Sequence, residues 1–368
     1  MKIGPILGIL SMARANSNPF VGGQNESFTE IIEYAERMDC IAFVFSPFDI
    51  DWSKSAVMGY HFNRNTDEWE RRACPLPTVI YNRIPNRTLE NRADTAEVLA
   101  LLRQKYGPRI FNPCFLDKWK THKILSGNDG TKHFLPETRL LSSPETIAGM
   151  LGKHRSVFLK PSANSLGNEM FKVSKKGNRT FHFIHQTLNQ EQREGLVSRC
   201  SQLVSELPSP EDTTGYLVQQ FITLARFRDR PFDLRLLMQK NRAGKWQKTG
   251  IAARIAGDRS ITTHVLYGGT RLPAEQVIME SSNTHGFSSS HVLNKLQEIQ
   301  VSVPRAIEKG YRASFGELEM DVGIDKTGRV WFFEANSKPF RFDEKLIRAK
   351  SLVRLIHYVH YLDSKFYP

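Results

Sequence analysis

Cysteine is scarce in this chain of 368 residues, which contains four. No two of them form a Cys-x-x-Cys pair, and no histidine stands near them at the spacing of a zinc finger. This distribution argues against a disulfide framework and against a structural zinc site. We expect buried apolar thiols at Cys40, Cys74, Cys114 and Cys200.

Long hydrophobic runs are also missing. A membrane-spanning helix needs a run of roughly 18 or more apolar residues, and the sequence has none. The apolar stretch near the N-terminus is short and is interrupted by Gly4 and Pro5, which makes it a poor signal peptide. These absences predict a cytoplasmic protein.

Recognisable nucleic-acid motifs are absent as well: we find no helix-turn-helix, zinc-finger or RNP signature. The net charge is nevertheless +13, from 51 Lys and Arg against 38 Asp and Glu. Because the basic residues are spread along the chain, nucleic acid is not the favoured partner. An acidic polymer, an assembled surface or simple solubility remains open as the reason for the charge.

The first third of the chain alternates strand and helix patterns. Apolar runs over Ile3–Leu10 and Cys40–Ser46 flank a helical spacing over Phe28–Met38, which predicts a βαβ unit with parallel strands. A polar segment with aromatic residues from Trp52 to Trp69 predicts a hairpin. A strand over Thr78–Tyr81 and a helix over Leu89–Tyr106 are expected to follow.

From Asp117 onward the pattern indicates mixed α+β structure. We predict helices over 117–126, Glu191–Glu206, Val292–Lys309 and Glu344–Tyr361; strands over Thr138–Leu141, Ser156–Lys160, Tyr216–Ile222, Leu234–Gln239 and Gly250–Ile255; and a serine-rich loop over 281–290.

The segment Gly316–Pro339 carries the clearest chemical pattern. Glu334 and Asn336 close an apolar run and, being two residues apart on a strand, point to the same face. Asp321 closes the preceding run, so one face of a hairpin has two carboxylates and an amide. Hard oxygen ligands of this kind suit Mg²⁺ or Mn²⁺. The alternative is an ordinary solvated hairpin with acidic strand ends.

Two acidic neighbours are interpreted differently from the proposed ligands. Glu317 and Glu319 precede Asp321 in the same segment. We expect them to be solvated or to be charges at the start of a helix.

Two lysines stand at positions that suit phosphate binding. Lys160 ends an apolar strand and is followed by a Ser/Asn/Gly loop, without the Gly-Lys-Ser/Thr ending of a Walker A motif. Asp117 can cap a helix whose first turn carries Lys118, where a cation opposes the helix dipole unless an anion holds it. Taken singly, these patterns also fit a surface hairpin and a solvated lysine.

The order of these elements resembles the ATP-grasp superfamily. FLKPSANSLGNEMFKV, RPFDLRLLMQK, GIAARIAG and the Glu-Ala-Asn end are similar to glutathione-synthetase-like and ribosomal-protein glutamate-ligase-like enzymes. The whole chain resembles the endospore coat-associated ATP-grasp proteins of spore-forming bacteria. The resemblance implies an N-terminal βαβ pre-ATP-grasp domain over 1–114. Two α+β subdomains that hold ATP would follow, over 115–215 with a lid loop and over 216–368.

The resemblance also assigns roles to individual residues. It makes Lys118 and Lys160 the phosphate-binding lysines; Ser162, Ser165 and Gly167 parts of the lid; Gln219, Gln220, Phe221 and Ile222 the adenine site; Asp233 and Arg235 a nucleotide-site Asp-x-Arg pair; Arg254 and Arg235 the catalytic arginines; and Asp321, Glu334 and Asn336 the ligands of two Mg²⁺ ions. The lid has a single glycine, where relatives often have several.

The activity that the resemblance implies is an ATP- and Mg²⁺-dependent ligase. It would join a carboxylate to an amine or a thiol through an acylphosphate, in endospore coat formation and with spore-coat proteins as partners. Two other classes stay open: a structural coat or coat-assembly protein that binds ATP without turnover, and a basic module that binds an acidic polymer.

The basic segment after Asn336 suggests where an acceptor could bind. We predict that Lys338 and Arg341 receive an anionic substrate, such as an acidic peptide or polymer. Arg348 and Arg354 are expected to lie on a solvated helix.

Overall fold

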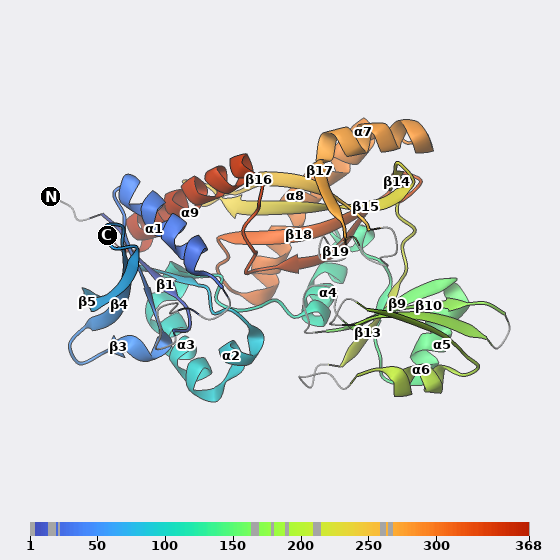
Figure 1. The fold of residues 1–368 in the computed structure, drawn as a ribbon, viewed down its shortest axis with the longest axis horizontal. Coiled ribbons are helices and arrows are strands. Elements are labelled where there is room, and N and C mark those ends of the chain that lie inside the picture. Colours follow the sequence, from blue (N-terminus) through green and yellow to red (C-terminus); the bar gives the residue numbers. More distant parts are fainter. Residues whose placement is uncertain are drawn as a thin grey trace.

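The structure is a computed structural model that describes residues 4–13, 20, 23–162, 169–177, 180–187, 191–208, 215–257, 263 and 268–367. Three β-sheets follow one another along its long axis, with the first sheet at one end and the second at the other (Figure 1). Helices cover each sheet, and the third sheet lies between the other two in space.

The first sheet begins with the predicted βαβ unit. Strand β1 (Ile6–Leu10) leads through helix α1 (Asn25–Arg37) to β2 (Ile41–Phe45), and the two strands pair in parallel. On its other side β1 pairs in parallel with β6 (Val79–Asn82), which pairs with β7 (Ile110–Phe111). The βαβ prediction is confirmed.

The predicted hairpin is confirmed too, as β4 (Ala56–Asn63) and β5 (Glu68–Pro75), with β3 (Ile50–Asp51) pairing on β4. The single helix expected over Leu89–Tyr106 is instead two helices, α2 (Arg87–Asn91) and α3 (Ala93–Tyr106). The break falls at Arg92, whose ψ of 132° is not helical.

The second sheet has the strand order β12-β11-β10-β9-β13-β8. Its strands are β8 (Thr138–Leu140), β9 (Ser156–Pro161), β10 (Met170–Lys175), β11 (Phe181–Gln186), β12 (Gln192–Val197) and β13 (Tyr216–Gln220). Helices α5 (Pro144–Lys153) and α6 (Cys200–Glu206) pack their apolar residues on this sheet.

The helix predicted over Glu191–Glu206 is wrong in its first half. Residues 192–197 form β12, which pairs antiparallel with β11, and only α6 is helical. Gly195 lies opposite Phe183, and a Cβ atom there would stand 2.8 Å from the Phe183 ring. Pairing with a neighbouring strand, which a local pattern does not record, decides the structure here.

The third sheet has the order β17-β16-β15-β18-β19, with β14 (Arg226–Phe227) pairing on β15. Its strands are β15 (Arg230–Lys240), β16 (Trp246–Ile255), β17 (Thr270–Pro273), β18 (Glu317–Ile324) and β19 (Val330–Asn336). Helices α7 (Ala274–His285) and α8 (Ser289–Tyr311) pack on it.

The serine-rich loop predicted over 281–290 is wrong for most of its length. Helix α7 continues through buried Ser281 and Ser282 to His285, and α8 begins at Ser289. Gly286, with φ of 77°, ends α7 in the left-handed conformation that glycine adopts without strain.

The two faces of the third sheet differ in chemistry. Leu234 and Leu236 of β15, with Leu318 and Met320 of β18, belong to the core under α7 and α8. Because side chains alternate along a strand, the residues between them point to the opposite face. That face carries the buried groups Asp233 and Gln239 of β15 and Glu317, Glu319 and Asp321 of β18, together with the partly buried Arg235 of β15.

Helix α9 (Lys345–Phe366) returns to the first sheet, where it lies beside α1 (Figure 1). Leu355, Ile356 and Val359 share a core with Phe28 of α1 and Phe111 of β7. The last helix of the chain therefore completes the core of the first sheet.

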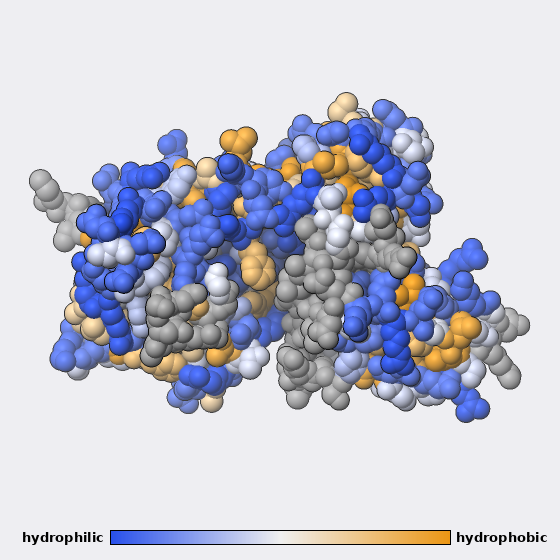
Figure 2. All heavy atoms as spheres, in the orientation of Figure 1, coloured by the Kyte–Doolittle hydropathy of each residue, from blue (hydrophilic) through white to orange (hydrophobic). Residues whose placement is uncertain are grey.

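The surface seen in Figure 2 is largely hydrophilic. Among the described residues, no helix is long and apolar enough to cross a membrane. All four cysteines are free thiols, and the prediction that they are buried is confirmed for Cys40, Cys74 and Cys200, whereas Cys114 is half-buried.

Candidate functional site

A helix start and a strand end meet between the second and third sheets. Asp117 caps α4 (Lys118–Ser126) by accepting a hydrogen bond of 2.6 Å from the Lys120 backbone, as the sequence predicts. The Ser162 hydroxyl, just after β9, donates to the second Asp117 oxygen at 3.1 Å. This contact fixes the first turn of α4 beside the end of β9.

Both predicted phosphate lysines stand at this junction. The Lys118 ammonium lies 3.3 Å from a Glu334 carboxylate oxygen on β19. Lys160 ends β9 with only 7% of its surface exposed. Burial, together with the charge of Lys118, lowers the pKa of Lys160 to about 8, although Glu334 and Asp321 act in the opposite direction.

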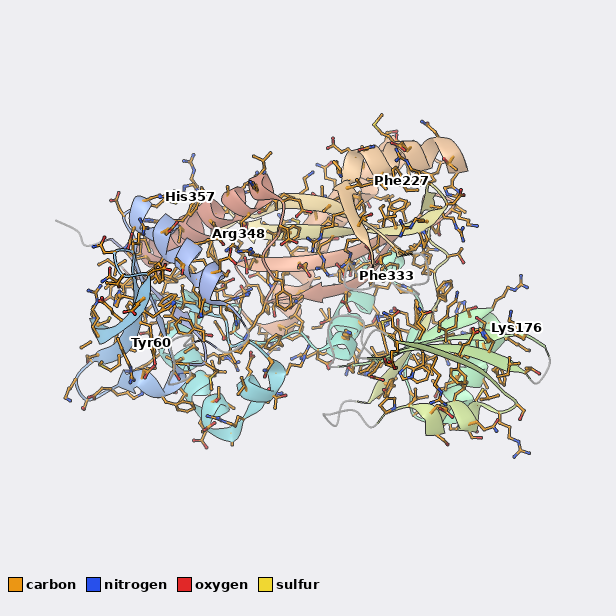
Figure 3. All side chains as sticks on the ribbon, in the orientation of Figure 1. Tyr60, Lys176, Phe227, Phe333, Arg348 and His357 are labelled. Atoms are coloured by element: carbon orange, nitrogen blue, oxygen red, sulfur yellow. The ribbon has the colours of Figure 1, made fainter. Side chains whose placement is uncertain are left out.

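A pocket opens around these groups. Its lining joins both sheets and α4 and includes Lys118, His122, Thr138, Lys160, Gln219, Phe333 and Glu334. Figure 3 shows Phe333 on the side of the third sheet that faces the second sheet. The His122 imidazole contributes no charge near neutral pH, because burial lowers its pKa to about 4.

The segment predicted to hold adenine runs from β13 toward the third sheet. Gln219 lines the pocket and donates to the Thr138 hydroxyl at 2.9 Å. The Gln220 amide oxygen accepts from the Glu137 backbone at 3.2 Å. Phe221 packs on another aromatic ring with centroids 5.1 Å apart, and Ile222 is buried. The structure thus places Gln219 in the pocket, and the adenine role of the four residues stays a prediction.

The predicted metal ligands lie together on the polar face of the third sheet. Asp321 stands opposite Glu334 across β18 and β19, and Asn336 stands opposite Glu319. The Asn336 side-chain oxygen also accepts from the Lys338 backbone at 3.0 Å. The hairpin geometry inferred from the alternation is therefore present, while metal binding by these residues stays a prediction.

The arginines of neighbouring strands neutralise these acids. Arg254 donates through its Nε to Asp233 at 2.8 Å and lies 2.9 Å from Asp321. Burial lowers the pKa of Arg254, but Asp233 and Asp321 outweigh that effect and hold the pKa well above its usual value. Arg235 lies 3.3 Å from Asp321 and 3.2 Å from Glu319. One Arg254 nitrogen, Nη1, is buried without a hydrogen-bond partner among the described residues.

Glu319 is the acidic residue of the site that the sequence reading missed. It was expected, like Glu317, to be solvated or at a helix start, and both are instead buried on β18 with 5% and 6% exposure. Burial raises the pKa of Glu319 to about 7, although Arg235 acts against it. Glu317, Glu319 and Asp321 are spaced two residues apart, which places them on one face of a strand. This spacing in the sequence could have indicated that Glu319 lies beside Asp321.

The oxygen atoms of the predicted ligands are of the kind that a hard divalent cation prefers. Asp321, Glu334 and Asn336 offer only oxygen ligands, with Glu319 beside them. Within the described ranges, however, no three His, Cys, Asp or Glu side chains are grouped as metal ligands. Lys118, Arg235 and Arg254 neutralise the carboxylates instead.

Of the remaining predicted residues, Lys338 and Arg341 lie outside this pocket. Ser165 and Gly167 fall outside the described residues. The Lys338 ammonium is buried against Glu90 and donates to Asn82 at 3.1 Å, so its contacts give no support to a role in substrate capture. Arg341 lies near Glu26 of α1 and lines a second pocket.

The fold and the pocket between the two α+β sheets define an ATP-grasp protein. Solved structures share the fold: the VanG D-Ala:D-Ser ligase of Enterococcus faecalis has a TM-score of 0.54 at 10% identity, covering 98% of this chain and 99% of its own. D-alanyl-alanine synthetase A of Vibrio cholerae has a TM-score of 0.54 at 9% identity, covering 98% of this chain and 100% of its own.

Sequence comparison defines the family. Residues 107–362 match the model of the YheC/D-like ATP-grasp family, and the chain belongs to that family. The endospore coat-associated protein YheD of Bacillus subtilis is 30% identical over 99% of this chain and 80% of its own length. The endospore coat-associated protein YheC of the same organism is 24% identical over 91% and 88%.

Proposed function

We propose that the protein is an ATP-dependent ligase that binds Mg-ATP in the pocket between the second and third sheets. The observation that carries this proposal is the meeting of buried Lys160 and half-buried Lys118 with Glu334 in the lining of that pocket, where Asp321 stands opposite Glu334 on the neighbouring strand. Cations suit the phosphates of a nucleotide, and the facing oxygens suit Mg²⁺. Both features support the binding of a metal–triphosphate complex in this pocket.

The reaction that fits this arrangement is carboxylate activation. A carboxylate oxygen of the substrate attacks the γ-phosphorus in line, the bond from γ-phosphorus to the bridging oxygen breaks, and ADP leaves. An amine then attacks the acyl carbon of the acylphosphate, phosphate departs, and the amine loses a proton. A thiol nucleophile would react in the same way.

The position of each residue in the site suggests its role in this reaction. Lys160 and Lys118 would hold the phosphates. Arg254, whose Nη1 has no hydrogen-bond partner among the described residues, would donate to the transferring phosphoryl group. Asp321, Glu334 and Asn336 would hold Mg²⁺, which supplies charge neutralisation of the phosphates when bound. Asp233 orients Arg254 through a two-point contact.

A role in the spore coat is proposed from the relatives. YheD and YheC are both described as endospore coat-associated. A ligase of this family could modify coat proteins, and spore-coat proteins are therefore the partners we propose.

Nucleotide binding is tested by thermal unfolding with and without Mg-ATP. We expect Mg-ATP to raise the melting temperature of the wild type, because a ligand that binds only the native state stabilises it. Lys160→Met should lose this shift. Lys240→Met, which removes another mostly buried lysine that pairs with Glu308, should keep it relative to its own nucleotide-free melting temperature. A folded wild type with no shift at millimolar Mg-ATP would refute the proposed function.

A further inference from the structure

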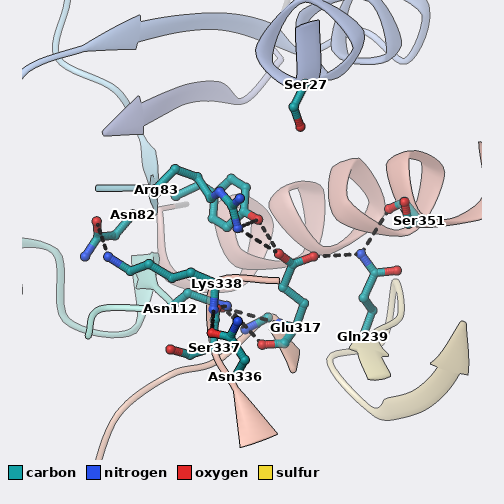
Figure 4. A network of polar contacts seen from close by, with 12 residues as sticks. Ser27, Asn82, Arg83, Asn112, Gln239, Glu317, Asn336, Ser337, Lys338 and Ser351 are labelled. Carbon is teal, nitrogen blue, oxygen red and sulfur yellow. Dashed lines mark hydrogen bonds and ion pairs between the residues drawn. The ribbon is translucent and has the colours of Figure 1, made fainter. Parts of the chain in front are cut away.

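A second pocket lies where the first sheet, the third sheet and α9 meet. Three guanidinium groups line it, those of Arg83 after β6, Arg341 after β19 and Arg348 on α9. Glu317 of β18 and Gln239 of β15 also line it and lie close together in Figure 4. No residue of this pocket has a role in the nucleotide site described above.

Glu317 is the one acid among the described residues that line the pocket, and its carboxylate already has several partners. The Glu317 carboxylate accepts a hydrogen bond from the Tyr81 hydroxyl through one oxygen and from the Gln239 amide at 3.0 Å through the other (Figure 4). Arg83 lies 3.8 Å from the same carboxylate. Glu317 therefore has its charge stabilised from several sides and is a poor reason for three arginines to gather.

The arginines keep donors to spare. Arg83 uses Nε and Nη1 for contacts of 3.4 Å to Gln24 and Tyr81, and its Nη2 has no hydrogen bond to a described residue. Arg348 donates through Nε to Glu30 and through Nη2 to Ser27 of α1. Its Nη1 likewise has no hydrogen bond to a described residue. Because a guanidinium carries five N–H donors in a planar fork, both groups can still bind an oxyanion.

The acid that holds Arg341 is a weak competitor for an incoming anion. Glu26, the partner of Arg341, has 72% of its side chain exposed. Because an exposed ion pair contributes little free energy, an anion displaces Glu26 at low cost. Glu30 holds Arg348 by hydrogen bonds from two nitrogens, so an anion would bind Arg348 through its remaining Nη1 donors. Figure 3 shows Arg348 between α9 and α1, on the wall of this pocket rather than on the solvated helix face that the sequence reading expected.

The pocket shares a sheet face with the proposed phosphoryl-transfer site. Glu317 is four residues before Asp321 on β18, and both side chains point to the polar face. At about 3.3 Å per residue, the two positions are about 13 Å apart. An extended peptide of about four residues has that length.

We propose that this pocket binds an anionic group, a carboxylate or a phosphate, on the acceptor chain that the enzyme modifies. This inference rests on the proposed function, because only a ligase has an acceptor chain to modify. The bound group anchors the chain about 13 Å from the carboxylate that is activated, a distance that an extended segment spans. The preferred acceptor is therefore an acidic peptide or polymer rather than a single small amino acid.

The test measures binding of a fluorescently labelled hexaglutamate peptide by anisotropy, without nucleotide, at physiological ionic strength. We expect Arg83→Gln and Arg348→Gln to weaken binding about tenfold each, the loss of a charge-assisted hydrogen-bond pair. Arg354→Gln, on the same helix but outside the pocket, removes the same charge and should change the affinity less than about twofold. Ser27→Glu, which offers Arg348 an internal carboxylate, should weaken binding as well.

Each outcome decides the proposal. Wild-type affinity in Arg83→Gln and Arg348→Gln, with folding verified, would overturn it, as would an equal loss in Arg354→Gln, which would reveal general charge attraction only. Should Arg83→Gln unfold, Arg348→Gln and Ser27→Glu carry the test. Competition by inorganic phosphate and by acetate then distinguishes the phosphate form of the ligand from the carboxylate form. Because no nucleotide is present, failure here is separate from failure of Mg-ATP to stabilise the protein.

Discussion

Burial of Lys160 favours its neutral form, whereas the proposed binding of phosphate requires its charged form. An ammonium group inside the protein loses hydration, and this loss with the nearby Lys118 charge brings its pKa down to about 8. A triphosphate in the pocket would restore a counter-charge and favour the protonated lysine. Nucleotide binding should therefore take up a proton whenever Lys160 is neutral in the free protein.

This coupling predicts a pH dependence with a definite sign. Below the pKa of about 8 the lysine is already charged and the affinity for Mg-ATP should be flat; above it the affinity should fall, approaching tenfold per pH unit. Calorimetric titration at about pH 7, 8 and 9 measures this change. Lys160→Met should bind weakly at every pH, and a wild-type affinity that is constant up to about pH 9 would contradict the assignment.

At the scale of elements, α4 owes its position to close packing on α8. A Cβ atom on Gly310 of α8 would stand 2.4 Å from Ile124 of α4, so only glycine allows the helices to lie this close. Because α4 carries Lys118 on its first turn, this contact sets where a phosphate-binding group stands. Packing between α4 and α8 thereby controls the geometry of the pocket.

Gly310→Ala should therefore damage stability and binding together. Overpacking at such a contact costs about 1–3 kcal/mol of unfolding free energy, and the displaced α4 should weaken Mg-ATP binding. Gly149→Ala on α5 is the matched control, because nothing lies within 4 Å of its new methyl group; it should instead stabilise by about 0.5–1 kcal/mol. Urea unfolding and nucleotide titration of both variants measure this, and equal stabilities would show that α4 has room to spare.

At the scale of the whole molecule, Asn112 ties the first sheet to the third. It has a φ of 52°, its side-chain amide donates to the Glu317 carbonyl at 2.9 Å and also to the Ser337 carbonyl, and its oxygen accepts from the Gly316 backbone at 2.7 Å. The buried pair of Lys338 and Glu90 lies beside this contact. Lys338 thus serves the junction between sheets.

Asn112→Ala should destabilise the protein by about 3 kcal/mol or more, because buried backbone groups lose their partners and alanine is strained at positive φ. Asn112→Gly isolates the hydrogen bonds, since glycine adopts this backbone conformation freely, and it should recover about 1 kcal/mol. Chemical denaturation followed by circular dichroism gives both values. A loss under 1 kcal/mol in the alanine variant would mean that the junction does not depend on Asn112.

How far the sequence predicts this molecule depends on where the deciding partner lies. The Asp117 cap and the shared face of Glu334 and Asn336 follow from neighbours a few residues away, and both appear in the structure. The burial of Glu319 depends on Arg235 of another strand, and that of Lys338 on Glu90, 248 residues earlier in the chain. Local periodicity contains no record of such partners, which is also why β12 was predicted as helix.

The return of α9 to the first sheet has a consequence for biosynthesis. A ribosome delivers α1 and β7 long before it delivers Leu355, Ile356 and Val359, which complete their core. During that interval α1 already packs on β1 and β2, but the part of the core that α9 covers stays exposed, so the nascent chain presents an apolar surface to solvent. An mRNA truncated before α9 would yield a protein whose folding defect lies near its N-terminus, in the first sheet. Chaperones would bind this product but could not complete its folding.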